Sequence, residues 1–268
     1  MFSYKKIIGF ICLLLIQQQI VAQNKFTTLV WSDEFNYKGL PDSSKWSYDK
    51  GKGCPDNCGW GNNELQYYSV SRSENARVQK GKLIIEARKE DFSGAAYTSA
   101  RLVTKNKGDW KYGRIEIKAR IPAGRGMWPA IWMLPTDWAY GGWPNSGEID
   151  IMENVGYLRD SIFGAIHTGA YNGMLGTQKV KSIFKEGSSK KFHVFAIEWT
   201  EDEISFYVDG VRFNNFKNEH KGSAEWPFDE EFHLLMNIAV GGDWGGKFGV
   251  DDKIFPQQLI VDYVRVYQ

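Results

Sequence analysis

Apolar and polar positions alternate along most of the chain, with the period of two that is typical of β-strands. The pattern is clearest at 113–121, where Ile115, Ile117 and Ala119 are separated by charged residues. We expect further strands at 82–88, 97–104, 130–134, 148–153, 191–200, 204–210, 232–240 and 259–268. Glycine-rich turns separate these segments, and no amphipathic helix of three turns is visible. The pattern predicts an all-β sandwich or barrel, and a sandwich with one curved sheet would leave a long concave groove on its outer face.

The composition is consistent with one globular catalytic or binding domain. The 268 residues are 43% hydrophobic, which is enough for one sizeable core. The formal net charge of +1 does not favour a nucleic acid or a strongly charged substrate as partner. We expect a single domain over 23–268, acting as a monomer.

The first 22 residues resemble a secretory signal peptide. The basic "MFSYKK" precedes the apolar "IIGFICLLLI" (7–16), and Ala22 is a small residue suited to cleavage. The apolar run is shorter than the roughly 20 residues that span a bilayer. A retained anchor helix is the alternative, and lipidation of Cys12 is disfavoured because Cys12 lies inside the apolar run. We expect a secreted or periplasmic protein with no membrane attachment after cleavage.

Cleavage would remove Cys12 and leave Cys54 and Cys58, in "GCPDNCGW". In an exported protein a disulfide is the natural interpretation, and its effect would be local because the loop it closes is short. Two free thiols remain the alternative. A metal site is disfavoured, since no second cysteine pair or nearby histidine accompanies the two residues.

The segment "GEIDIMEN" contains the candidate catalytic residues Glu148, Asp150 and Glu153. On a regular strand Glu148 and Asp150 share a face, and Glu153 is one residue out of step. A β-bulge at Ile151 or Met152 would return Glu153 to that face, and bulges are common beside active sites. Repulsion between carboxylates this close raises the pKa of at least one of them. Glycoside hydrolysis needs such a difference, because one carboxylate acts as the nucleophile while a protonated partner acts as the acid. The alternatives are a solvated polar face and a calcium site.

Tryptophans surround this acidic segment and favour a sugar-binding surface. Trp128 and Trp132 are four positions apart and share one face of a regular strand, and Trp138 and Trp143 follow before the acids. Aromatic rings stack on the apolar faces of sugar rings, although core packing would also account for each tryptophan taken alone.

Several blocks in order, among them "WGNNELQYY", "GRIEIKARIPAGRGMWPAIWMLP", "SGEIDIMENVG" and "LLMNIAVGGDWGG", resemble the family 16 glycoside hydrolases, and most of all the bacterial laminarinases, which are endo-β-1,3-glucanases. The resemblance runs from about Thr28 to Gln268. It implies a jelly-roll β-sandwich of the concanavalin A-like kind, with a concave substrate cleft and a retaining mechanism. Glu148 matches the nucleophile, Glu153 the general acid/base and Asp150 the assisting carboxylate.

The same resemblance implies a set of substrate-binding residues along the cleft: Asn63, Arg101, Trp128, Trp132, His167 and Trp244. Asn63 could instead be a turn residue, Arg101 a charge on a strand face and His167 a structural histidine. No cofactor is implied for catalysis. One structural Ca²⁺ is implied at Glu34, Gly81 and Asp262, with backbone oxygens at the first two and a carboxylate at the third.

The resemblance leaves other functions open. Relatives with the same acidic motif act on marine galactans, and some activity on mixed-linkage β-glucan is compatible with the chain. A transglycosylase would use the same carboxylates. Non-catalytic glucan-binding proteins share the scaffold and lack the catalytic glutamates, whereas Glu148 and Glu153 are both present here.

Overall fold

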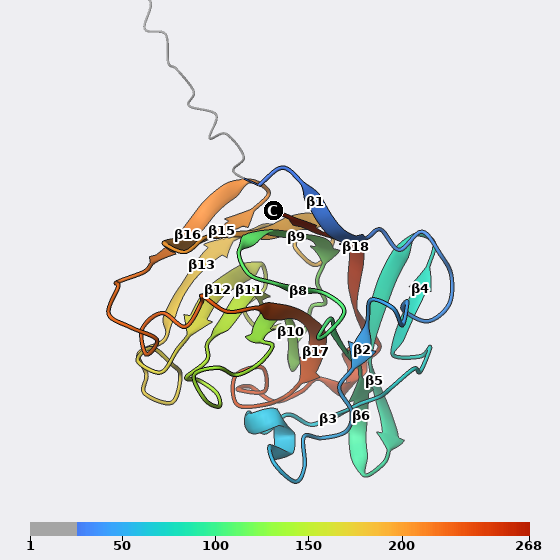
Figure 1. Cartoon of the computed structure of the whole chain (residues 1–268). Helices are drawn as coiled ribbons and strands as arrows, with labels where there is room; N and C mark the ends of the chain where they lie inside the picture. The colour runs from blue at the N-terminus through green and yellow to red at the C-terminus, as the bar shows by residue number, and fades with distance from the viewer. Residues whose placement is uncertain (1–25) are drawn as a thin grey trace, which may run out of the picture.

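A computed structural model describes residues 26–268 as two β-sheets packed face to face (Figure 1). The predicted signal peptide, 1–22, lies outside the described residues. Within the described part, no helix is both long and apolar enough to cross a bilayer. The helical elements there are two short 3-10 turns, η1 (Cys58–Gly61) and η2 (Asp252–Ile254).

The larger sheet has ten strands and runs mainly antiparallel. Its order is β16 (Val211–Lys217), β15 (Glu203–Val208), β14 (His193–Trp199), β9 (Gly113–Arg120), β18 (Gln257–Tyr267), β5 (Lys82–Phe92), β6 (Ala95–Ser99) and β3 (Gln66–Tyr68). Two further strands join its path, β1 (Leu29–Asp33) beside β18 and β4 (Ala76–Gln79) beside β5.

The smaller sheet has eight strands and carries the acidic segment. Its order is β13 (Lys179–Phe184), β12 (Ser161–His167), β11 (Glu148–Glu153), β10 (Met127–Pro135), β17 (Phe232–Val240), β7 (Arg101–Val103) and β2 (Ser47–Tyr48), with β8 (Asp109–Trp110) beside β17. We call the side of this sheet that faces away from the larger sheet the outer face.

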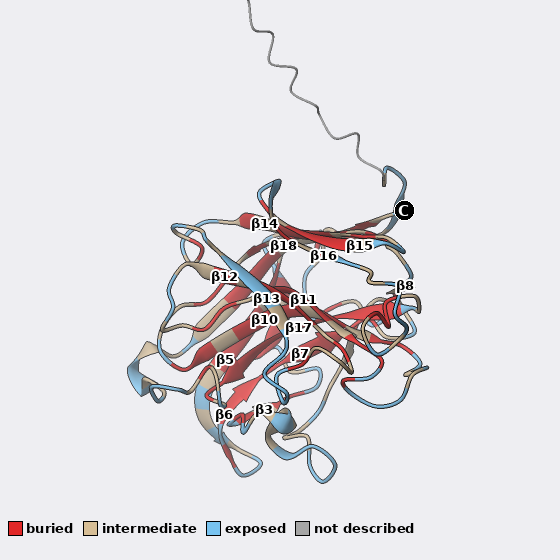
Figure 2. Ribbon diagram, turned by 90° about the vertical axis from the view of Figure 1, so that its left-hand side faces the viewer, coloured by how far each residue is buried: buried red, intermediate tan, exposed pale blue. Residues whose placement is uncertain are grey.

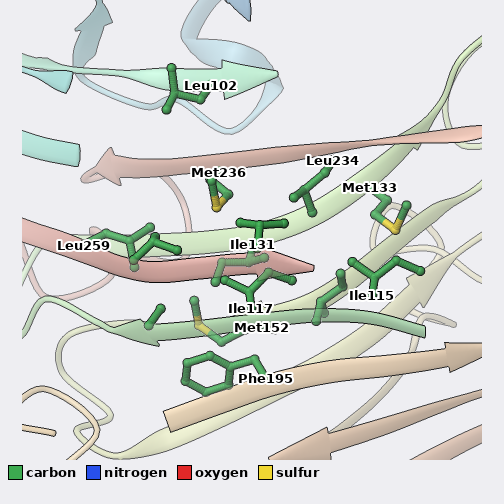
Figure 3. Close-up of a cluster of buried hydrophobic side chains, with 14 of the residues drawn as sticks. Leu102, Ile115, Ile117, Ile131, Met133, Met152, Phe195, Leu234, Met236 and Leu259 are labelled. Atoms are coloured by element: carbon green, nitrogen blue, oxygen red, sulfur yellow. The ribbon is translucent and has the colours of Figure 1, made fainter. Parts of the chain in front are cut away.

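The hydrophobic core fills the space between the two sheets. The larger sheet contributes Ile115 and Ile117 from β9, and the smaller sheet contributes Ile131, Met133 and Met236 (Figure 3). All five are fully buried, so the alternation along 113–121 marks the buried face as predicted. The burial colouring shows the same arrangement, with buried residues concentrated on the strands of both sheets (Figure 2). The predicted β-sandwich is therefore confirmed.

One predicted strand is in fact two. The segment expected at 97–104 divides into β6 in the larger sheet and β7 in the smaller sheet, with the fully buried Ala100 between them. Both strands are apolar and extended, so the pattern did not reveal the crossing. The prediction of a single strand there was wrong, and the consequence is that Arg101 belongs to the sheet that carries the acids.

Candidate active site

A β-bulge in β11 brings the three acidic residues to one face. Toward β12, the pairing runs from Asp150 opposite Ala165 to Glu153 opposite Phe163, with a register shift between. Toward β10, Met152 pairs with Ile131 and Asp150 pairs with Trp132, so Ile151 is the extra residue. Ile151 and Met152 are both buried. The predicted bulge is confirmed, and Glu148, Asp150 and Glu153 all point to the outer face.

Asp150 is the most enclosed of the three acids, with 2% of its surface exposed. Burial, together with the negative charges of Glu148 and Glu153, raises its pKa well above the ordinary carboxyl value. The Nε2 atom of His167 lies 3.4 Å from its Oδ2 atom. Asp150 therefore favours the protonated form, in which it has an O–H to donate to a neighbouring carboxylate.

Glu153 has the properties of a general acid. Burial is the main cause that raises its pKa to about 7, and the charge of Glu148 adds to the effect. Trp128, on β10, donates its indole N–H to Glu153 Oε1 over 2.9 Å, which partly opposes the increase. A carboxyl group with a pKa near 7 holds a proton at slightly acidic pH and can release it during a reaction.

Glu148 is oriented by two neighbours from different segments. Trp143, in the loop before β11, donates its indole N–H to Glu148 Oε2 over 2.7 Å. His167, paired with Glu148 across β11 and β12, has its Nε2 atom 4.0 Å from Glu148 Oε1. Burial lowers the pKa of His167, but contact with Asp150 and the charge of Glu148 outweigh burial and raise it to about 9. His167 therefore carries a positive charge beside the acids at neutral pH.

Arg101 lies on the same face, on β7, and is held between aromatic rings. Its guanidinium carbon is 3.8 Å from the centre of the Trp60 ring and 5.6 Å from that of Trp132. Its Nε atom donates to Asp49 Oδ2 over 2.7 Å. Such stacking fixes the planar guanidinium group with its remaining N–H donors available.

Asn237, on β17, lies between Arg101 on β7 and the tryptophan-bearing strand β10. It pairs with Arg101 on one side and with Ala130 on the other. Its Oδ1 atom accepts the Trp132 indole N–H over 2.7 Å, and its Nδ2 atom donates to the Tyr68 hydroxyl over 3.1 Å. Trp132 is thereby fixed by a side chain that the sequence analysis did not include.

Trp244 covers the Glu153 end of the site. Its ring contacts Trp128 and Phe163 edge-on, with centroid distances of 5.5 and 5.1 Å. The glycine-rich loop is what allows this approach, because a Cβ atom on Gly245 would lie 2.8 Å from Trp128 Cβ. The loop therefore needs glycine at this position.

Asn63 lies at the rim of the site rather than beside the acids. It has a left-handed backbone, with φ of 55°, and its amide donates to Asp243 Oδ1 over 2.9 Å. Both residues line a pocket that Leu65 and Tyr97 also border. The backbone conformation agrees with a turn residue, and the pocket leaves the amide accessible to a ligand.

Two groups of residues could be considered for metal binding. Ligand atoms of Glu148, Asp150 and His167 all lie within 4.8 Å of one another. The raised pKa values of Asp150 and His167 favour the protonated forms, which do not bind metal ions.

The residues predicted to bind calcium do not fit the ion. Asp262 Oδ1 lies 2.7 Å from Lys82 Nζ and its Oδ2 lies 2.8 Å from Lys118 Nζ. The Glu34 carboxylate is paired with Arg265. Lys82 Nζ also donates to the Gly81 carbonyl oxygen over 3.2 Å. Two of the three predicted ligands, the Gly81 carbonyl oxygen and the Asp262 carboxylate, are therefore already bound to lysine side chains.

The structure joins Cys54 to Cys58, the first residue of η1, by a disulfide. Trp60, within η1, stacks on Arg101. The disulfide therefore lies in the loop that positions an aromatic neighbour of the site.

Two side chains at the site, Trp60 and Asn237, were not predicted from the sequence, and Trp143 makes a specific contact that was not predicted. Trp143 was noted as part of an aromatic cluster without a specific contact. Asn237 had a visible signal, since it is a lone amide within the otherwise apolar "LLMNIAV". A polar side chain in a buried strand needs a hydrogen-bond partner, and here the partners belong to the site.

Residues 63–264 match the family model described as glycosyl hydrolases family 16. The chain is 58% identical over 247 residues to a beta-glucanase of Rhodothermus marinus, covering 90% of this chain and 85% of that protein. The crystal structure of the Rhodothermus marinus laminarinase superposes with a TM-score of 0.87 at 57% identity, covering 90% and 97% of the two chains. The laminarinase of Flavobacterium sp. UMI-01 has a TM-score of 0.82 at 43% identity, covering 90% of this chain and all of that chain. With this fold and this bulged acidic strand, the chain belongs to glycosyl hydrolase family 16.

Proposed function

We propose that this protein is an endo-acting β-1,3-glucanase that cleaves laminarin-type glucans with retention of configuration. The observation that carries the proposal is the bulge of β11, which presents two glutamates on one face with an aspartate between them. The similarity to laminarinases supports β-1,3-glucan as the substrate. Catalysis in this family needs no cofactor, and the proposal includes no calcium ion.

In the proposed mechanism, Glu148 attacks the anomeric carbon and forms a covalent glycosyl-enzyme, while Glu153 donates its proton to the leaving oxygen. Glu153 then removes a proton from the water that hydrolyses the intermediate. Its pKa of about 7 suits both steps. Protonated Asp150 donates a hydrogen bond to the Glu148 carboxylate, which orients it and moderates its charge. The Trp143 indole N–H, from the loop before β11, donates a second hydrogen bond to the Glu148 carboxylate.

The aromatic residues supply the sugar-binding surface. Trp128 and Trp132 lie on the outer face on both sides of Ala130, next to the acids. We propose that Trp128, Trp132 and Trp244 stack against glucose rings, and that Arg101, Asn63 and His167 donate hydrogen bonds to sugar hydroxyls. The positive charge of His167 also stabilises the negative charge on the nucleophile.

The assignment of roles can be tested by azide rescue. Glu148→Ala should lose at least about 10³-fold in kcat on laminarin and, with azide, form the α-glycosyl azide. Glu153→Ala with azide should form the β-glycosyl azide from an aryl glucoside with a good leaving group. Exchange of the two products would show that the roles are reversed. Wild-type activity in both variants would contradict catalysis by these residues.

The substrate can be tested by a product profile on laminarin, curdlan, lichenan and agarose. We expect release of a series of short β-1,3-linked oligosaccharides from laminarin and curdlan. Slow cleavage of lichenan at bonds next to β-1,3 linkages is compatible with the proposal. Dominant cleavage of agarose would overturn the substrate and leave the mechanism in place.

We also propose that the protein is exported as a monomer after removal of residues 1–22, leaving one domain over 23–268. The basic and apolar run before Ala22 supports cleavage, and the Cys54–Cys58 disulfide is typical of oxidising compartments. Amino-terminal sequencing of protein recovered from the periplasm and the medium would test the cleavage site. Recovery of the intact chain in a membrane fraction would favour a retained anchor.

A further inference from the structure

The edge strand β13 presents apolar side chains on the outer face, beyond the residues described above. Val180 is 43% exposed and Phe184 is 69% exposed. Ile183 packs against the core, so alternation places 180, 182 and 184 on the opposite side of the strand. Val180 and Phe184 therefore share the outer face with the acids.

This surface continues directly from the acidic strand. In the sheet register, Asp150 pairs with Ala165 on β12, and Ala165 pairs with Val180 on β13. Two strand spacings amount to about 10 Å, which an oligosaccharide chain bound at the acids can cross. Arg101 and Asn237 lie on the opposite side of the acids, on β7 and β17. On the outer face of the smaller sheet, polar side chains therefore lie on one side of the acids and apolar side chains lie on the other.

The loop before β13 extends the apolar surface toward His167. Met174 is 73% exposed and Leu175 is 63% exposed. The preceding residue, Gly173, lies beside His167, because a Cβ atom built on Gly173 would be 3.9 Å from His167 Cε1. We define the β13 surface as Met174, Leu175, Val180 and Phe184.

The chemistry of the β13 surface favours a neutral sugar. Exposed apolar side chains that gather on one face of a protein are typical of binding surfaces. Between Val180 and Phe184 the outer face carries only Ser182, while Lys179 and Lys181 alternate to the other side. Lys179 is moreover paired with Glu219. Aromatic and aliphatic side chains next to a hydroxyl group match the C–H faces and hydroxyls of a pyranose.

We propose that the β13 surface binds the glucose residues on the reducing-end side of the cleaved bond, with Phe184 stacking on a ring. The inference rests on the proposed function, and it assigns the sugars on the non-reducing-end side of that bond to Arg101, which lies on the opposite side of the acids. The occupant is the same glucan chain that reaches the acids. Binding there would favour long substrates over short ones and would position an acceptor sugar during transfer.

The test compares Phe184→Ala and Phe184→Trp on two substrates. Laminarin places sugars on both sides of the bond, whereas 4-nitrophenyl β-laminaribioside places only the nitrophenyl group on the reducing-end side. For Phe184→Ala we expect kcat/KM to fall about tenfold on laminarin and to stay unchanged on the aryl glycoside. Phe184→Trp should retain activity on both. Val211→Ala, at an apolar position on β16 that is 57% exposed, is the matched control and should behave as wild type.

Each other outcome overturns the inference in a recognisable way. Wild-type activity of Phe184→Ala on laminarin would refute the sugar site and leave the proposed function intact. An equal loss on both substrates would indicate a general effect on the site rather than reducing-end binding. A dimer in sedimentation that Phe184→Ala converts to a monomer would assign the surface to self-association. A wild-type protein that cleaves neither substrate would refute the proposed function, and the sugar site with it.

Discussion

Replacing Glu153 by Gln should remove most of the activity and at the same time stabilise the protein at neutral pH. Glutamine keeps the shape of the side chain and an oxygen that can accept the Trp128 N–H. It is neutral at every pH and so resembles protonated Glu153. The general acid is lost, and we expect kcat on laminarin to fall by at least about 10³-fold.

The stability effect follows from the raised pKa. In the folded protein the pKa of Glu153 is about 7, compared with 4.5 for the ordinary side chain. Below pH 4.5 Glu153 is protonated in both the folded and the unfolded wild type, so it does not lower the free energy of unfolding. As the pH rises from 4.5 to 7 the unfolded state releases its proton first, so the folded state becomes progressively less favoured. Above pH 7 Glu153 is ionised in both states, and the loss of unfolding free energy has reached its full value.

The size of this cost comes from the difference of about 2.5 between the two pKa values. At 1.36 kcal/mol per unit, the upper bound is about 3 kcal/mol. A domain of this size gains roughly 2–4 °C in Tm per kcal/mol, so the variant should melt up to about 12 °C higher than wild type at pH 8. At pH 4 the two proteins should melt together.

The assay is urea denaturation of both proteins at pH 4, 6 and 8, with Glu186→Gln, an exposed carboxylate outside the site, as control. The difference in unfolding free energy between Glu153→Gln and wild type should grow with pH. A constant difference, or a variant that is less stable at pH 8, would show that Glu153 is not held protonated by its surroundings. The assignment of Glu153 as the acid would then lose its physical basis.

Four further predictions follow from the contacts described above. Trp128→Phe removes a hydrogen bond that lowers the pKa of Glu153, so the basic limb of the pH–rate profile should move to higher pH; a shift to lower pH would contradict the contact. His167→Gln should destabilise the protein most below pH 6.5, with the loss disappearing as the pH rises through 9, because the folded pKa of His167 is raised to about 9; denaturation at pH 6 and pH 10 measures this, and an equal loss at both would refute it. Arg101→Lys should raise KM for laminarin about tenfold with little change in Tm, since lysine cannot stack as guanidinium does on Trp60; unchanged kinetics would argue against sugar binding there. Addition of EDTA or CaCl₂ should leave Tm unchanged, because two lysines hold the Asp262 carboxylate; a rise in Tm with calcium would show that the ion displaces them.

Much of the fold was predictable because strands with one buried face produce clear alternation. The ranges at 148–153 and 232–240 agree with β11 and β17 to the residue. The bulge was predictable for the same reason, since an acid out of step on a strand requires an extra residue. The strands that escaped notice have weaker patterns, and β12 is the clearest case. It contains Gly164, whose missing Cβ makes room for Phe206 and Phe213 of the facing sheet. A glycine selected for close packing looks like a strand breaker in the sequence.

The site was predictable where residues share a strand with the acids, and less so where distant segments meet. Trp128 and Trp132 are identified by spacing along β10. The contact of Trp143 with Glu148 depends on the path of a loop, and that of Trp60 with Arg101 depends on the turn after the disulfide. The calcium prediction did not take account of Lys82 and Lys118, because two of its three ligands were backbone oxygens. Side chains that neutralise a carboxylate from neighbouring strands leave no pattern within one strand.

The extra residue in β11 also alters what lies beneath the catalytic surface. A chain shortened by Ile151 would read Glu-Ile-Asp-Met-Glu, a plain alternation that again turns all three carboxyl groups outward. The insertion is thus invisible from the substrate side, and its effect is to send two consecutive side chains, Ile151 and Met152, inward where a regular strand sends one. A chain with the shorter spacing would have to fill that volume from another strand, so deletion of Ile151 should be tolerated only with larger interior side chains nearby.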